Sequence, residues 1–113
     1  MFIENSFRAV RVAGSGTMEN TSCDLIAGKA GGKGYCIEVK ASKKPQKYIT
    51  KEQINDFIVF SEIIGLKPVV AVKFNRKGWF FLNPEDLTET EKNWCINLEA
   101  AQKKGRRFAQ FFA

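Results

Sequence analysis

The sequence of 113 residues contains no histidine. This absence excludes Ser-His-Asp and Cys-His catalysis, and every metal site that needs an imidazole ligand. The three cysteines, Cys23, Cys36 and Cys95, are odd in number and none has C-x-x-C spacing. We therefore expect free, buried thiols in a protein of the reducing cytoplasm. Acid–base or metal chemistry must then rely on carboxylates, lysine or water.

Long apolar runs are also missing, and no segment is long enough to cross a bilayer. The N-terminus lacks a basic region followed by an apolar stretch, so we expect neither a signal peptide nor a membrane partner. The length suits one domain, residues 1–113, with a single core. Acidic residues are the minority, 12 against 18 Lys and Arg, which gives a net charge of +6. Such a basic surface suits a polyanion, most often nucleic acid.

Apolar segments predict strands at five places, with one further short strand at residues 94–96. A glycine-rich turn at residues 28–34 joins the second and third strands into a hairpin. We expect an α/β fold in which a central mixed sheet of about five strands is flanked by helices. The five strands are expected at residues 7–13, 23–27, 35–41, 68–74 and 79–82.

Two segments have the pattern of a helix. Thr50 and Gln53 form a Thr-x-x-Gln capping box, which predicts a helix that begins after Thr50 and ends at Gly65. Apolar residues recur along it at helical spacing. Residues 97–112 predict a second helix with a basic face, although Gly105 in its middle lowers the helix propensity.

Asp24 and residues 37–40 form the strongest candidate site. Residues two apart on a strand point to the same face, so Glu38 and Lys40 share one face. Ile37 and Val39 then point into the core. Pairing within the hairpin can bring Asp24 beside Glu38. Two carboxylates and a backbone carbonyl, that of Val39, are suitable ligands for a hard cation such as Mg²⁺.

This residue set suits the hydrolysis of a phosphodiester. A bound cation polarises the phosphate and lowers the pKa of a bound water. Lys40 can orient or help deprotonate the attacking water and screen the developing charge. The pattern D-x13-E-x-K is short, however. On this pattern alone, a surface strand with an ordinary Glu–Lys pair is the simpler interpretation.

Two other glycine-rich segments lack the spacing of nucleotide-binding loops. Segment 28–34 is one residue short of a P-loop, and Gly34 stands where Ser or Thr would ligate magnesium. Gly14-Ser15-Gly16 would need a third glycine where Glu19 stands. We therefore expect no small-molecule cofactor.

The order of several short blocks resembles the archaeal Holliday-junction resolvases, a branch of the PD-(D/E)xK nuclease superfamily. The resemblance extends from about residue 7 to about residue 93. No single block is specific, but together they are. In chain order the blocks are Arg8-Ala9-Val10-Arg11-Val12-Ala13-Gly14-Ser15-Gly16, Asp24-Leu25-Ile26-Ala27-Gly28, Ile37-Glu38-Val39-Lys40 leading to Lys43-Lys44 and Tyr48, Glu52-Gln53, Val70-Ala71-Val72-Lys73-Phe74 and Trp79-Phe80-Phe81.

The resemblance implies a restriction-endonuclease-like fold and a Mg²⁺-dependent endonuclease, with Mn²⁺ possible, that resolves four-way DNA junctions as a homodimer. A substrate with two-fold symmetry is best cut by a two-fold enzyme. The metal site is expected at Asp24, Glu38 and Lys40. Ser15 in a mobile loop and Gln53 on the helix are expected to serve catalysis. The expected DNA contacts are Arg8, Arg11, Gly16, Lys29, Lys33, Lys43, Lys44 and Tyr48.

The sequence departs from this family pattern in two places. Cys23 replaces the usual proline before the metal-binding aspartate. A first helix, whose glutamate completes the metal site in the family, is expected to be truncated, because it belongs upstream of Phe7. Two alternatives therefore stay open: a branched-DNA binding module with weak or no cleavage, and a related nuclease acting on other DNA structures.

Overall fold

The computed structural model describes residues 7–12 and 23–112, and it arranges them in two sheets with helices. Among these residues, no helix has the length and apolar character that crossing a bilayer requires. The elements in chain order are β1 (Arg8–Arg11), β2 (Leu25–Gly28), β3 (Gly34–Ser42), β4 (Gln46–Thr50), α1 (Lys51–Ile63), β5 (Lys67–Phe74), β6 (Gly78–Leu82), the 3₁₀ turn η2 (Pro84–Asp86), β7 (Thr88–Glu89), β8 (Asn93–Asn97), α2 (Leu98–Lys104) and α3 (Phe108–Phe111).

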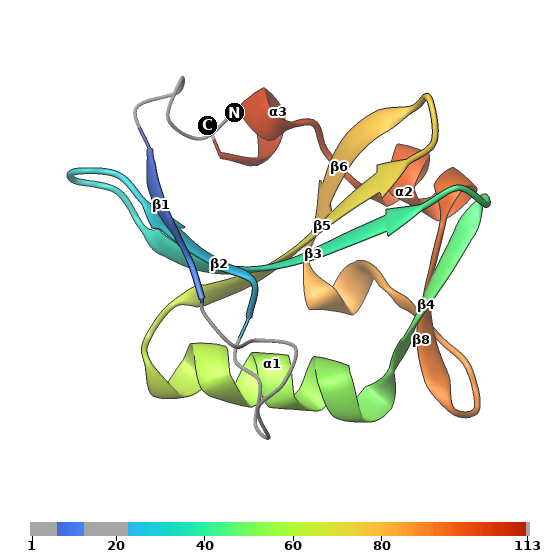
Figure 1. The fold of residues 1–113 in the computed structure, drawn as a ribbon, viewed down its shortest axis with the longest axis horizontal. Coiled ribbons are helices and arrows are strands. Elements are labelled where there is room, and N and C mark those ends of the chain that lie inside the picture. The colour runs from blue at the N-terminus through green and yellow to red at the C-terminus, as the bar shows by residue number, and fades with distance from the viewer. Residues whose placement is uncertain (1–6, 13–22, 113) are drawn as a thin grey trace.

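The larger sheet has five strands in the order β1-β2-β3-β5-β6. Strands β3 and β5 are parallel, and every other pair in this sheet is antiparallel. The connection between the two parallel strands runs through β4 and α1. In Figure 1, α1 lies along one side of this sheet and α3 lies on the other. The predicted mixed sheet of about five strands flanked by helices is confirmed.

Both faces of β5 are buried, as its continuous apolar sequence predicts. Val70 and Val72 belong to the core cluster that also contains Phe57 of α1. Val69 and Ala71 belong to a second cluster on the opposite face, formed with the C-terminal aromatic residues. Strand residues alternate between faces, so the middle of a strand that is covered on both sides is apolar at consecutive positions.

Strand β4 was not expected, because residues 43–47 have the composition of a basic loop. In the structure β4 pairs with β8, and with β7 these strands form a separate three-stranded sheet. Of its five residues only Ile49 is buried. The less exposed positions are Lys47 and Ile49, so a lysine hides the alternation in the sequence, and the partner strand is far away along the chain.

The start of α1 follows its sequence signal. The Thr50 Oγ1 accepts a hydrogen bond from the Gln53 N–H at 3.1 Å, and the Thr50 N–H donates to the Gln53 Oε1 at 3.3 Å. These reciprocal bonds satisfy two donors that the first turn of a helix leaves open. Gly65 follows the helix with φ of 73°, a conformation that favours glycine.

The expected helix at residues 97–112 is wrong in one respect, because Gly105 divides it into α2 and α3. A Cβ atom at Gly105 would lie 2.5 Å from the Ala101 carbonyl oxygen, so only glycine fits. The next residue, Arg106, is extended and exchanges two backbone hydrogen bonds with Phe81 at the edge of β6. This pairing, which the sequence does not reveal, replaces the helical hydrogen bonds.

We expect Gly105→Ala to destabilise the fold by about 1–3 kcal/mol, the usual cost of forcing an extra methyl group into a packed position. Thermal or denaturant unfolding measures the loss. Gln102→Ala, at an exposed position of α2, is the matched control and should leave the midpoint unchanged. Equal midpoints for Gly105→Ala and the unmodified chain would contradict this account of the break.

Candidate active site

The register of β2 on β3 places Asp24 beside Glu38. Leu25 pairs with Ile37, and the Asp24 N–H donates a hydrogen bond to the Ile37 carbonyl at 3.0 Å. On the other side, the Asp24 carbonyl accepts one from the Val12 N–H at 3.0 Å. The main chain of Asp24 is therefore held from both sides just before β2 begins.

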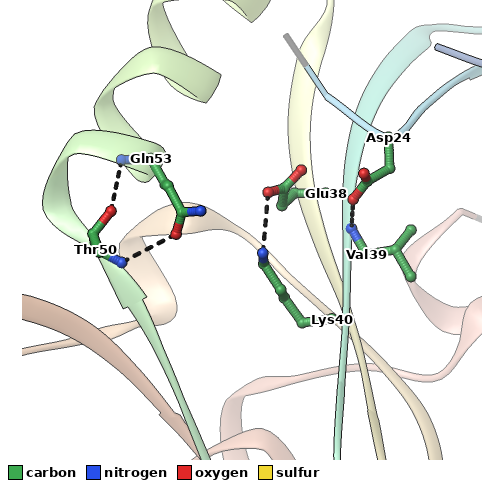
Figure 2. Close-up of polar contacts among 6 residues, drawn as sticks. All are labelled: Asp24, Glu38, Val39, Lys40, Thr50 and Gln53. Atoms are coloured by element: carbon green, nitrogen blue, oxygen red, sulfur yellow. Dashed lines mark hydrogen bonds and ion pairs between the residues drawn. The ribbon is translucent and has the colours of Figure 1, made fainter. Parts of the chain in front are cut away.

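The Asp24 side chain turns toward β3. Its Oδ2 accepts a hydrogen bond from the Val39 N–H at 2.7 Å (Figure 2). The N–H and C=O of an extended residue point to the same side of a strand, so the Val39 carbonyl also faces the Asp24 side. A hollow of about 410 Å³ opens here, and Arg11 is the cation in its wall.

Glu38 and Lys40 lie on the same face of β3, as their spacing predicts. The Lys40 Nζ is 3.5 Å from the Glu38 Oε2, and the two side chains are only 20% and 15% exposed. Figure 2 shows this pair between the strand and the start of α1. The lysine is therefore a fixed positive charge next to the carboxylates.

The surroundings of Glu38 disfavour its ionised form. Burial raises the pKa of Glu38 to about 7, and the Asp24 carboxylate contributes to the rise, while Lys40 lowers it in part. Like charges close together disfavour ionisation of both groups, and an added cation relieves that cost. The raised pKa therefore follows first from burial of Glu38 and then from the neighbouring Asp24 carboxylate.

The Cys23 thiol beside this site adds no charge. Burial raises the pKa of Cys23 to about 12, and the neighbouring Cys36 raises it as well. Both thiols are fully buried and free. The donors that remain are oxygens of Asp24, Glu38 and Val39, and hard divalent cations prefer oxygen. Within the described ranges, no group of three or more His, Cys, Asp or Glu is placed to hold a metal.

Gln53 occupies the start of α1, across from the Glu38–Lys40 pair. Its amide oxygen accepts the Thr50 N–H in the helix cap. In Figure 2 the side chain extends from the helix toward Lys40. The cap therefore fixes the direction of the Gln53 amide group. Ser15 and Gly16, also predicted for the site, lie outside the described residues.

The predicted DNA contacts fall into separate places. Arg8, Lys29 and Lys33 line one groove at the β2–β3 turn, and Arg11 lines the hollow beside Asp24. At the other end of β3, Lys43 and Lys44 are exposed in the turn to β4, and Tyr48 on β4 is 51% exposed. The structure therefore distributes these residues along the length of β3 instead of gathering them at the carboxylates.

Lys73 is a further candidate contact that the sequence pattern did not single out. This residue is exposed near the end of β5 and lines a shallow hollow of about 280 Å³ with Lys43 and Asn75. The available signal was a lysine that interrupts the apolar run of residues 68–74. Its proximity to Lys43 depends on the parallel pairing of β3 with β5, which the sequence does not reveal.

Two curated proteins that are similar to this chain have the same name. Crossover junction endodeoxyribonuclease Hjc of Archaeoglobus fulgidus is 35% identical over an alignment of 114 positions. The alignment covers 94% of this chain and 82% of that protein. The protein of the same name from Methanocaldococcus jannaschii is 42% identical over 94 residues, which cover 83% of this chain and 65% of that protein.

Comparison with solved structures leads to the same family. A solved structure of Archaeoglobus fulgidus Hjc, described as a Holliday junction resolvase from an archaeal hyperthermophile, matches with a TM-score of 0.89 and 28% identity. The match covers 99% of this chain and 91% of that chain, and it confirms the restriction-endonuclease-like fold. The family model of the archaeal Holliday junction resolvases (Hjc) matches residues 1–112. The chain therefore belongs to the archaeal Holliday junction resolvase family.

Proposed function

We propose that this chain is a metal-dependent endonuclease that resolves four-way DNA junctions, with Mg²⁺ as the first candidate ion and Mn²⁺ as the second. The observation that carries the proposal is the pairing of Asp24 with Glu38, which share one end of the β2–β3 ladder and repel each other's charge. Family membership supports the class of substrate.

The oxygens of Asp24, Glu38 and the Val39 carbonyl are the groups that would hold the ion. When bound, a divalent cation polarises the scissile phosphate and lowers the pKa of a coordinated water. The hydrogen bond from the Val39 N–H holds the Asp24 carboxylate in place, so this ligand is oriented before the substrate arrives. A fixed ligand loses little entropy on binding.

Lys40 supplies a positive charge beside the Glu38 carboxylate. Its ammonium group lies beside Glu38, where it can donate a hydrogen bond to the attacking water and stabilise the charge that develops on the phosphate. Gln53, whose amide group is held by the helix cap, lies on the same side of β3 as Glu38 and Lys40 (Figure 2). It is a further polar group for the same water or phosphate. Ser15 remains a candidate for the same role.

We further propose that two copies act together. A four-way junction has two-fold symmetry, and paired cuts at related positions need two sites related by the same axis. The end of α1 has apolar side chains at Val59, Ile63 and Ile64 that are 43%, 77% and 41% exposed. Val59 and Ile63 are four residues apart on the helix and share one face, which suits the same face of a second copy.

A cleavage assay with defined substrates tests the function. We expect the chain to nick a four-way junction at paired positions in Mg²⁺ or Mn²⁺, to be inactive in EDTA, and to cut linear duplex and flap substrates far more slowly. A cruciform plasmid distinguishes coordinated from independent nicks, because coordinated cuts give linear product directly. Equal rates on all substrates would favour a nuclease with a different target.

One observation favours a second candidate, a junction-binding protein that cuts poorly. In the part of the chain that the structure describes, the site contains two acidic residues and no third that could hold a metal with them. Tight, salt-dependent binding of the junction with no cleavage in either metal would support this alternative.

A further inference from the structure

The alternation of side chains breaks immediately before β2. Leu25 packs against the core cluster that contains Ile37, on one face of the larger sheet. Cys23 is fully buried in the other cluster, with Cys36 and the helix α1. Residues two apart on a regular strand share a face, so a regular strand would place Cys23 and Leu25 together. The chain therefore changes direction at Asp24, the residue between them.

The hydrogen bonds at Asp24 show how the strand is interrupted. Leu25 lies opposite Ile37 in the ladder, yet the Ile37 carbonyl accepts a hydrogen bond from the Asp24 N–H at 3.0 Å. Two consecutive residues of one strand then face one residue of the other, which is the arrangement of a β-bulge. A bulge bends its strand and redirects a side chain. Here the redirected side chain is Asp24, whose carboxylate accepts the Val39 N–H at 2.7 Å (Figure 2).

Cys23 holds this bulge from the core side. Its Sγ donates a hydrogen bond to the Leu25 carbonyl at 3.2 Å, so the bond spans Asp24. A thiol is a weak donor, but full burial among apolar side chains restrains it as well. From the side of β1, the Val12 N–H bonds the Asp24 carbonyl at 3.0 Å. The main chain on either side of the Asp24 carboxylate is therefore restrained.

We propose that Cys23 is a positioning residue for the metal site, because its buried side chain anchors the bulge that turns the Asp24 carboxylate toward Val39 and Glu38. This inference rests on the proposed function, in which Asp24 is a metal ligand. A ligand that is held in one orientation binds an ion more tightly than one that must first be ordered. The sulfur itself lies in the core and points at the Leu25 carbonyl, so Cys23 acts through Asp24.

The test compares single variants of the full chain. Cys23→Ala removes the thiol, and Cys23→Ser keeps a donor on a side chain of similar size. Cys95→Ala is the matched control, because it removes a buried thiol from β8 in the other sheet. The unfolding midpoint is measured in EDTA and across a Mg²⁺ series at pH 8, which requires no cleavage. Single-turnover cleavage of a four-way junction is measured over the same series. Cys23→Val, which fills the space without a donor, replaces Cys23→Ala if that variant does not fold.

For Cys23→Ala we expect the Mg²⁺ concentration at half-maximal stabilisation to rise roughly 10-fold, the usual effect of removing a group that orients a metal ligand. The Mg²⁺ concentration at half-maximal cleavage should rise by the same factor. The rate at saturating Mg²⁺ should stay within about threefold of the unmodified chain, because excess ion restores occupancy. Cys23→Ser should need at most about threefold more Mg²⁺ than the unmodified chain, since its hydroxyl can donate to the Leu25 carbonyl. Cys95→Ala should need no more Mg²⁺ than the unmodified chain.

A purely structural role for Cys23 gives a different result. Cys23→Ala would then unfold more easily in EDTA but need the same Mg²⁺ concentration as the unmodified chain, and the inference would fail while the proposed function stands. It also fails if Cys95→Ala raises the Mg²⁺ requirement equally, or if Cys23→Ser is as impaired as Cys23→Ala. If neither Mg²⁺ nor Mn²⁺ stabilises the unmodified chain or supports cleavage, the proposed function itself fails, and the inference with it.

Discussion

Glu38→Gln is expected to reduce junction cleavage by on the order of 10³-fold or more, because a neutral amide is a poor ligand for a divalent cation. Junction binding should be retained or slightly stronger, since the change removes a negative charge from a surface that faces phosphates. Single-turnover cleavage in Mg²⁺ and a binding titration in EDTA measure the two effects separately.

Asp24→Asn should have an effect of similar size on cleavage. The amide oxygen of asparagine can still accept the hydrogen bond from the Val39 N–H, so the local fold should survive. The double variant should be little worse than either single variant, because the two carboxylates act as one unit. Glu99→Gln removes an exposed carboxylate of α2 and should cleave normally. Unchanged cleavage by Glu38→Gln would refute the proposed site.

The second large effect that we expect is a fall in the free energy of unfolding of the metal-free protein as the pH rises. The pKa of Glu38 is raised from an ordinary value of 4.5 to about 7 in the fold. Between these pH values the folded chain holds a proton that the unfolded chain has released, so the free energy of unfolding falls as the pH rises. Below this window both states are protonated at this group, and above it the full loss is present. A shift of this size corresponds to a loss on the order of 3 kcal/mol.

Other carboxylates also titrate in this range, so the difference between Glu38→Gln and the unmodified chain is the useful quantity. We expect the variant to be more stable than the unmodified chain at pH 8, by on the order of 3 kcal/mol, and the difference to become small near pH 4.5. Urea unfolding in EDTA at several pH values measures it. Glu99→Gln should show no such trend. A pH-independent difference would mean that Glu38 does not carry the raised pKa.

Addition of Mg²⁺ extends the same experiment. A cation bound to the ionised carboxylates stabilises the folded state by mass action. The unmodified chain should therefore gain stability from Mg²⁺ at pH 8 and much less at pH 5, where Glu38 is protonated. Glu38→Gln should respond weakly at both pH values. This readout is independent of cleavage.

Elements with a local signal were predicted well. The capping box at Thr50 and Gln53 marked the start of α1, and the apolar run of β5 marked a strand buried on both faces. Elements that depend on distant partners were missed. Strand β4 forms because β8 pairs with it, and the chain breaks at Gly105 because Arg106 pairs with Phe81. No local pattern contains those partners.

The residues of the candidate site follow the same rule, because those with a local signal were predicted and one that depends on distant pairing was not. Asp24, Glu38 and Lys40 were found from strand alternation and hairpin pairing, which are short-range rules. Lys73 was missed because its closeness to Lys43 depends on the parallel pairing of β3 with β5. The candidate DNA contacts were identified as one set, but the structure separates those at the β2–β3 turn from those at the far end of β3.

The sequence by itself determined the chemistry available to this protein: oxygen donors and a lysine on one hairpin, with no histidine and a basic surface. These properties depend on residue type and on spacing along the chain. The tertiary structure alone decided the pKa of Glu38 and the distance from the carboxylates to the basic residues at the β2–β3 turn. The pKa of Glu38 rises because folding buries it and places Asp24 next to it. The groove at the β2–β3 turn, lined by Arg8, Lys29 and Lys33, lies about 13 Å along the strand from Asp24, because β1, β2 and β3 pair over four residues.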